Sequence, residues 1–321
     1  MLEENRGGNE NAGAVAAGEH AATPAHAPKM IAVVGPTASG KTTLAITLAQ
    51  RFNGEIVSAD SRQVYRGMNI GTAKPTAEEL RAAPHYCIDI KDPNEDYTVA
   101  EYKADAIAAI RDILARKKLP IMVGGTGLYV KAVLENLDIP KIAANPALRA
   151  KLEKEIAEEG LDMVFKKLVA LDPEAAYIVD PKNPRRVVRA LEVAITTGAP
   201  FTAQRVKHPP LFNTLTIGLN PPPEILRERI NARVDKMVND GLVAETEQLI
   251  KKYGADCPAF DAIGYREIIN HLNGKTSLHE AVALIKTNTW HYAKRQMTWF
   301  KKDKMVRWAE NHEEAFVLIE K

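Results

Sequence analysis

The residues with the clearest chemical meaning form a glycine-bounded loop that ends in lysine and threonine. Its pattern, G-x-x-x-x-G-K-[ST], lets successive backbone N–H groups face one anion, and a helix that follows adds positive dipole charge. Such a loop binds a diphosphate or a triphosphate. The candidate phosphate-binding residues are Gly35, Pro36, Thr37, Ala38, Ser39, Gly40, Lys41 and Thr42.

The last two residues of this loop have separate expected roles. Lys41 would reach the terminal phosphate, and the Thr42 hydroxyl would be a ligand of Mg²⁺. A chance glycine turn is the alternative, but an apolar run precedes the loop and helical periodicity follows it, as the motif requires.

The loop alone does not specify a reaction. The guanine-reading pattern N-K-x-D of GTPases is absent from the sequence, and Gly124, not an aspartate, follows the apolar run 119–123. We therefore expect an enzyme that acts on one phosphorylated small molecule, in preference to a motor or switch ATPase.

A second polar group begins two positions after the short apolar run 55–58. Ligands of parallel sheets bind at the carboxyl ends of the strands, so Asp60 should face the phosphate loop. Its carboxylate could hold Mg²⁺ through water, act as a general base, or simply cap a turn. Ser61, Arg62 and Gln63 extend the same loop with hydrogen-bonding side chains.

Three arginines stand where a helix disfavours them. Asn183 and Pro184 form a good helix start, and Arg185, Arg186 and Arg189 crowd the turns that follow. Cations there oppose the helix macrodipole, which makes sense if an external anion binds. A solvated charged face is the alternative.

Two further arginines lie on a helix expected to begin near residue 223. At about 100° per residue, Arg233 falls at the edge of the apolar face and Arg229 further round. A partly buried arginine needs an anion, either a phosphate or a nearby carboxylate. The pattern leaves open which of the two would contact a diphosphate.

Short apolar runs alternate with helical patterns around these residues. The expected strands are 31–34, 55–58, 119–123 and 215–219. Helical periodicity covers 41–52, and Thr98 with Glu101 makes a capping box for another helix. This alternation predicts an α/β fold, a P-loop NTPase-like parallel sheet core flanked by helices.

The middle of the chain has a different pattern. Apolar residues repeat there at helical spacing without any strand pattern, so we expect an all-helical insertion domain at 141–210. Residues 29–140 and 211–321 would then form the catalytic core. Residues 1–28 hold too few large apolar side chains to fold and are expected to be a disordered tail.

The overall charge conceals an uneven distribution. The chain holds 43 Lys and Arg against 41 Asp and Glu, which excludes only a uniformly basic protein. Residues 286–307 carry seven cations against one aspartate, residues 181–210 carry six against one glutamate, and all three tryptophans fall between 290 and 308. Basic side chains among aromatics suit RNA, whose phosphates meet the cations and whose unstacked bases meet the rings.

The cysteines and the hydropathy bear on the compartment. Two cysteines without a CxxC pattern exclude a disulfide framework and a cysteine zinc site. No apolar run is long enough to cross a membrane. We therefore expect a cytoplasmic protein.

Six blocks of the sequence together resemble the IPP transferase family, whose bacterial members are tRNA dimethylallyltransferases. They are GPTASGKT, SADSRQVYRGMNIGTAKP, VGGTGLY, RRVVRALEV, GYREII and AKRQMTWFKK, within about residues 30–310. The resemblance implies that N6 of the adenosine 3′-adjacent to the anticodon attacks C1 of dimethylallyl diphosphate, releasing diphosphate.

The resemblance also implies roles for individual residues. It makes Asp60 the base on the N6 amine and Thr126 a contact near the reacting centre, while Arg233 would stabilise the leaving group together with Mg²⁺. The implied tRNA contacts are Asp60, Ser61, Arg62, Gln63, Arg185, Arg186 and Arg189.

The implied partners are the anticodon stem-loop of tRNA and dimethylallyl diphosphate. No membrane or protein partner is implied, so we expect a monomer, with the helical insertion against the tRNA. Three alternatives share the phosphate loop: a relative of plant enzymes that prenylate free AMP, ADP or ATP, a small-molecule kinase, and a non-enzymatic RNA-binding protein. The helical insertion and the basic stretch favour tRNA.

Overall fold

The core of the protein is a six-stranded sheet in which every pair of neighbours is parallel. The computed structural model describes residues 29–139, 142, 144–204 and 208–320, so the expected tail lies outside the described residues. The strand order is β3-β2-β4-β1-β5-β6. The strands are β1 (Lys29–Val34), β2 (Gly54–Ser58), β3 (His85–Tyr86), β4 (Leu119–Gly124), β5 (Asn213–Leu219) and β6 (Arg307–Ala309).

Both faces of this sheet are buried by helices, which explains why its strands read as continuous apolar runs. Along β1, Ala32 and Val34 belong to one apolar cluster, and Ile31 and Val33 belong to the other. Helices α3 (Val99–Ala115) and α4 (Gly127–Leu134) supply the first cluster. Helices α1 (Lys41–Arg51) and α13 (His312–Glu320) supply the second.

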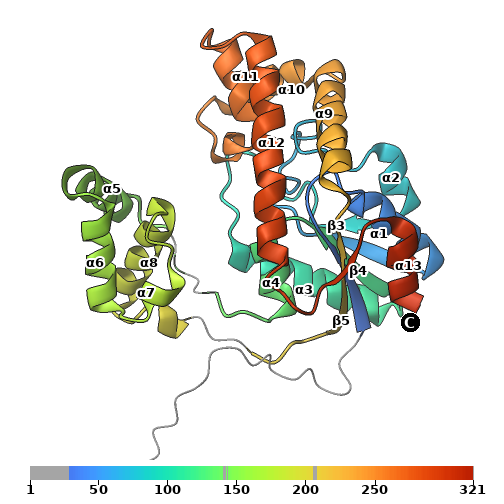
Figure 1. Ribbon diagram of the computed structural model, residues 1–321, viewed down its shortest axis with the longest axis horizontal. Helices are drawn as coiled ribbons and strands as arrows, with labels where there is room; N and C mark the ends of the chain where they lie inside the picture. The colour runs from blue at the N-terminus through green and yellow to red at the C-terminus, as the bar shows by residue number, and fades with distance from the viewer. Residues whose placement is uncertain (1–28, 140–141, 143, 205–207, 321) are drawn as a thin grey trace, which may run out of the picture.

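A separate group of helices stands above the sheet (Figure 1). Its members are α9 (Pro223–Asn239), α10 (Leu242–Tyr253), α11 (Tyr265–Leu272) and α12 (Leu278–Phe300). The short helices α2 (Ala77–Ala82) and η2 (Pro258–Asp261) lie in the connecting loops. Since Gln296 of α12 hydrogen-bonds to Thr37 and Gly125, which follow β1 and β4, this group covers the carboxyl ends of the strands.

The middle of the chain forms a small helical body with its own apolar cluster (Figure 1). It consists of α5 (Pro146–Glu159), α6 (Leu161–Leu171), α7 (Ala175–Ile178), α8 (Pro184–Thr197) and the turn η1 (Thr202–Gln204). The described residues between 142 and 204 contain no strand, in agreement with the all-helical pattern. Asn183 caps α8 by accepting the Arg186 N–H, with Pro184 as the first helical residue.

Most of the predicted elements are confirmed to within two or three residues. The four expected strands and the helix after the phosphate loop are present, and Thr98 and Glu101 form the predicted capping box. The strands β3 and β6 and the helix α13 were not predicted. The two strands are only two and three residues long, which is too short for an alternating pattern.

Candidate active site

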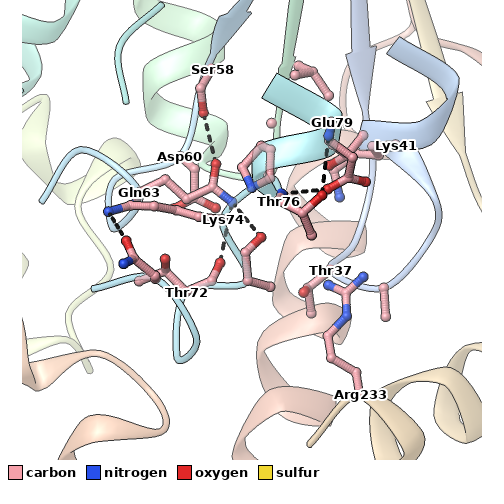
Figure 2. A pocket seen from close by; sticks show the side chains of 18 of the residues that line it. Thr37, Lys41, Ser58, Asp60, Gln63, Thr72, Lys74, Thr76, Glu79 and Arg233 are labelled. Atoms are coloured by element: carbon pink, nitrogen blue, oxygen red, sulfur yellow. Dashed lines mark hydrogen bonds between the residues drawn. The ribbon is translucent and has the colours of Figure 1, made fainter. Parts of the chain in front are cut away.

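The loops that follow β1, β2 and β4 meet in one cavity of about 740 Å³ (Figure 2). Helices α9 and α12 complete its wall. The residues that carry the argument below are Thr37, Lys41, Thr42, Asp60, Gly125, Arg233, Tyr292 and Gln296. The cavity thus joins most of the phosphate loop to the first residue of the second polar loop, as the topology of a parallel sheet predicts.

The backbone of the phosphate loop explains two of its glycines. Gly35 has φ 138°, and a Cβ there would lie 2.5 Å from the Leu219 carbonyl oxygen of β5. Gly40 has φ 94° and caps α1 in the left-handed region. Both positions exclude ordinary side chains, so the loop keeps the close turn that opens the N-terminus of α1 toward the cavity.

Two cations face this cavity without a carboxylate ion partner. Burial and the nearby Arg233 guanidinium lower the pKa of Lys41 to about 7, although the Asp60 carboxylate opposes the shift. Burial also lowers the pKa of Arg233, which forms no hydrogen bond or ion pair with any residue that the structure describes. Figure 2 shows the Arg233 guanidinium beside Thr37. Two cations without a carboxylate ion partner beside a phosphate loop make a site for a multiply charged anion.

The geometry also separates the two candidate arginines of α9, Arg229 and Arg233. Arg233 is half-buried and lines the cavity, whereas Arg229 is exposed and does not line it. Of the two arginines between which the sequence could not decide, Arg233 is therefore the better candidate for a diphosphate contact.

Asp60 sits at the opposite side of the cavity from Arg233, in a tight turn (Figure 2). Its Oδ1 accepts the Arg62 N–H at 2.8 Å and the Gln63 N–H at 3.3 Å. The Asp60 charge and burial together raise the pKa of the Tyr292 hydroxyl to about 12, with burial the larger cause. The turn fixes one carboxylate oxygen, so the residue has a defined direction toward the cavity.

Thr126 links the loop after β4 to the loop after β2. Its Oγ1 accepts the Ser61 N–H at 3.0 Å and donates to the Ser61 hydroxyl at 3.3 Å. Thr126 itself does not line the cavity, and neither do Ser61 and Arg62. The hydroxyl therefore holds the neighbours of Asp60 in place.

Gln296 of α12 bridges the loops that follow β1 and β4. Its Oε1 accepts the Thr37 N–H at 2.8 Å, and its Nε2 donates to the Gly125 carbonyl at 2.9 Å. The residue is buried, with an exposed fraction of 6%. A Cβ at Gly125 would lie 2.1 Å from Gln296 Nε2, so the glycine makes room for this bridge.

The side chain of Gln63 is engaged within the protein. Its Nε2 donates to the Thr72 and Ala73 carbonyls, and its Oε1 accepts the Ser58 hydroxyl. Lys74 in the next loop is occupied as well, by the Tyr65 carbonyl, Asn69 and Asp89. Both residues line the cavity but also shape the loop that walls it.

The far side of that loop is anchored by Glu245 of α10. Its carboxylate accepts the N–H groups of Asn69, Ile70 and Gly71 at 2.9–3.2 Å, together with the Tyr265 hydroxyl at 2.6 Å. A Cβ at Gly71 would lie 2.4 Å from the Tyr265 ring. The loop is therefore preorganised before any ligand binds.

The three arginines of α8 lie on the helical body, away from the cavity, and differ from one another. Arg189 donates to Glu192 at 2.5 Å and to the Ile142 carbonyl, so it has an internal anion. The Arg185 side chain is 90% exposed and lies 3.6 Å from Asp261. Arg186 is exposed, and its guanidinium has no bond to a residue in the described ranges. Arg186 is thus available to an external anion, whereas Arg189 already has an internal one.

The donor atoms near the phosphate loop fit one mode of metal binding. Thr42 lines the cavity, but among the described residues no three His, Cys, Asp or Glu side chains form a metal cluster. Mg²⁺ typically takes one or two protein ligands and completes its shell with waters and substrate phosphates. The residues therefore fit a metal held mainly by a bound diphosphate.

Three residues of the site were missed from the sequence as contributors. Gln296 and Tyr292 lie near the C-terminal end of α12, and Gln296 is part of the block AKRQMTWFKK. Glu245 is an acidic residue on an amphipathic helix. Of the three, only Gln296 could have been suspected from the sequence, because it is a neutral polar residue on the buried face of α12.

Comparison with known proteins covers most of the chain. A family model described as IPP transferase matches residues 63–303. The tRNA dimethylallyltransferase of Roseiflexus sp. (strain RS-1) is 49% identical over 274 residues, which cover 85% of this chain and 90% of the relative. The corresponding protein of Bacillus cytotoxicus is 46% identical over 282 residues, covering 87% and 89%. No helix of the described part is long and apolar enough to span a membrane.

Solved structures agree with these relatives. The tRNA isopentenylpyrophosphate transferase of Bacillus halodurans superposes with a TM-score of 0.66 at 42% identity, covering 91% of this chain and 97% of that one. A eukaryotic dimethylallyltransferase acting on tRNA gives a TM-score of 0.70 at 32% identity, covering 85% and 70%. The chain belongs to the IPP transferase family.

Proposed function

We propose that this enzyme transfers a dimethylallyl group from dimethylallyl diphosphate to N6 of the adenosine 3′-adjacent to the anticodon in tRNA. In the proposed step, the N6 lone pair forms a bond to C1 while the bond from C1 to the diphosphate oxygen breaks. Diphosphate leaves, and one N6 proton must be removed. The names of the relatives and the geometry of the cavity support this assignment.

The phosphate-loop end of the cavity is the proposed donor site. Charge grows on the diphosphate as the C1–O bond breaks, and groups already aimed at that charge lower the barrier. Lys41 and Arg233 meet this description because neither has a carboxylate ion partner among the described residues. The amides of the loop and the N-terminus of α1 add further positive potential.

We propose Mg²⁺ as the metal, with the Thr42 hydroxyl as its protein ligand. When bound, it would neutralise charge on the diphosphate. The chain supplies few acidic ligands there, so the metal is expected to enter with the diphosphate.

The acceptor end is assigned to Asp60 and the residues that hold it. We propose that Asp60 accepts the proton from N6, since its carboxylate lines the same cavity as Lys41 and Arg233. Thr126 and Tyr292 would keep the Asp60 loop at a fixed distance from the donor. The reacting adenosine must leave its stack to enter the cavity, as other enzymes that modify bases require.

The proposed tRNA surface has two parts. Asp60, Ser61, Arg62 and Gln63 border the entry of the base, and Arg185, Arg186 and Arg189 belong to the helical body at 141–210. The exposed guanidiniums of Arg185 and Arg186 suit phosphate contacts. Arg189 would act indirectly, through its hydrogen bond to the Ile142 carbonyl.

One chain contains the whole cavity, which supports a monomer as the active form. The two buried free cysteines, Cys87 and Cys257, are consistent with the proposed cytoplasmic location.

The single observation that carries this function is the shared cavity: a diphosphate cradle with two cations that have no carboxylate ion partner among the described residues, and an aspartate on the other side. The test is to incubate the protein with labelled dimethylallyl diphosphate, Mg²⁺ and unmodified tRNA, and to measure label in the tRNA. Asp60→Asn is expected to lower kcat by about 10²–10⁴-fold while tRNA binding is largely kept.

The matched control is a tRNA in which the adenosine next to the anticodon is replaced by guanosine. Label is expected only in the unaltered tRNA. Label on free AMP, or consumption of ATP with a metabolite and no label in tRNA, would overturn the proposal in favour of a nucleotide prenyltransferase or a kinase.

A further inference from the structure

The C-terminal helix reaches the phosphate loop through one side chain. His312, the first residue of α13, lies with Nε2 3.1 Å from the carbonyl oxygen of Gly40. A carbonyl can only accept, so the imidazole donates this bond from Nε2. A Cβ on Gly40 would lie 3.0 Å from the same nitrogen, so the contact leaves little free space.

The carbonyl that accepts the His312 hydrogen bond belongs to the peptide unit that joins Gly40 to Lys41 at the start of α1. Gly40 precedes Lys41, and in a planar trans peptide the C=O of one residue points opposite to the N–H of the next. Fixing the Gly40 carbonyl therefore fixes the direction of the Lys41 N–H. That N–H is one of the unpaired amides at the start of α1 that are available to an anion.

No side chain at the cap itself performs this task. Gly40 is the N-cap of α1 and lacks a side chain, and its φ of 94° lies in the left-handed region. Its carbonyl also accepts the Leu44 N–H at 3.1 Å within the helix. A glycine peptide has more freedom than others, so an external hydrogen bond has the most to add here.

The rest of α13 keeps His312 in place. The two helices run in the same direction, because His312 meets the start of α1 and Glu320 pairs with Arg51 at its end (Figure 1). Ala315 is fully buried, and Phe316 packs on the same apolar cluster as α1. The imidazole is thus presented by a docked helix and not by a free terminus.

We propose that His312 is a positioning residue of the phosphate site, which aims the first amides of α1 at the bound diphosphate. The inference rests on the proposed function to the extent that the loop binds the donor's diphosphate. His312 lies outside the residues that the family model matches. It acts through Gly40 and does not itself line the cavity.

The test compares three proteins: the wild type, His312→Gln and His312→Ala. Glutamine keeps an N–H donor at a similar reach, and alanine removes it. The binding of inorganic diphosphate with Mg²⁺ is measured by calorimetry, followed by steady-state kinetics with tRNA. Since a net hydrogen bond corresponds to about a threefold to tenfold change, His312→Ala should raise the Kd of diphosphate by about that factor.

The kinetic pattern is as informative as the affinity. The KM of dimethylallyl diphosphate should rise with the Kd in His312→Ala, whereas the KM of tRNA stays unchanged. His312→Gln should lie within about twofold of the wild type. Glu320→Gln is the matched control, because it loosens the far end of α13 without touching the loop.

Each outcome separates the two ideas. If the wild type binds no diphosphate, the proposed function fails at the phosphate loop. If the wild type binds diphosphate and His312→Ala binds it equally well, the positioning role is wrong. Equal losses in His312→Gln, His312→Ala and Glu320→Gln, matched by equal falls in Tm, would also overturn it, since they would indicate helix docking alone.

Discussion

Two groups of cationic side chains in this protein differ in what lies next to their charge. In the helical body, Arg149 and Arg189 both donate to Glu192, a carboxylate with no exposed surface. In the cavity of the core, Arg233 has no partner among the described residues and faces Lys41. The first group is neutralised by the fold, and the second awaits an anion from outside.

The pKa values express the same difference. Burial alone would raise the pKa of Glu192, but hydrogen bonds from Arg149, the Asn145 N–H and Arg189 outweigh it and hold the pKa at about 2. In the cavity, burial and a neighbouring cation lower the pKa of Lys41 to about 7. Paired charges stabilise the folded chain. Two like charges held close together lower its stability, but they create a binding site for an anion.

Within this comparison, the largest expected effect comes from removing the arginine of the cavity. Arg233→Gln should lower kcat/KM for the prenyl donor by about 10²–10³-fold, because a group aimed at the developing diphosphate charge is lost. Steady-state kinetics with tRNA measures it. Arg229→Gln, one turn away and exposed, is the control and should stay near the wild type. Equal losses in both variants would break the distinction between a cavity arginine and a surface arginine.

The paired group should instead affect stability. Glu192→Gln leaves Arg149 and Arg189 without their carboxylate, and since both arginines are more than a third exposed we expect a loss of about 1–3 kcal/mol in unfolding free energy. Urea unfolding measures it, with the exposed Glu158→Gln as control. The folded-state pKa lies below the usual value of 4.5, so this contribution is present above about pH 4.5 and disappears as the pH falls toward 2.

If Glu192→Gln unfolds like the wild type, the ion pairs of the helical body have no structural role. The arginines there would then have to be explained by tRNA alone, and the contrast with Arg233 would disappear.

A third expectation concerns protons taken up with the diphosphate. An anion between Lys41 and Arg233 favours the charged lysine, so the pKa of Lys41 should rise from about 7 on binding. Above pH 7, binding then takes up a proton, and affinity for a diphosphate analogue falls by up to about tenfold per pH unit. Calorimetry in buffers of different ionisation enthalpy measures this uptake. Lys41→Gln should abolish it, and an unchanged uptake in that variant would place the proton elsewhere.

The smallest effect is expected at the exposed arginine of α8. Arg186→Ala should weaken tRNA binding severalfold and reduce the slope of log K against log salt by about 1, as the loss of one phosphate contact does. Binding titrations at several salt concentrations measure it. Lys154→Ala on α5 is a control of the same charge, and an equal change in both would indicate a general charge effect of the helical body.

Local patterns of the sequence were sufficient for most of the fold. The alternation of buried runs and helices predicted the parallel sheet, and the capping pairs at Thr98 and Asn183 marked two helix starts correctly. The phosphate loop and Asp60 were both expected at the carboxyl edge of the sheet, and they line one cavity there. These features depend on residues close together in the chain or on a rule that holds for every parallel sheet.

Contacts between distant residues could not be predicted in this way. Gln296 joins Thr37 across 259 positions, and His312 joins Gly40 across 272. Whether an arginine meets an internal carboxylate also depends on packing, which gave Arg149 a partner 43 positions away and left Arg233 without one among the described residues.

What the amino-acid sequence by itself determined is the sheet, the cradle and the family resemblance, because each is encoded in short-range spacing. Only the tertiary structure decided which cations remain available to a substrate. A charge is neutralised by whatever lies within a few ångströms of it, and that neighbourhood exists only after helices from opposite ends of the chain have packed around the strand ends.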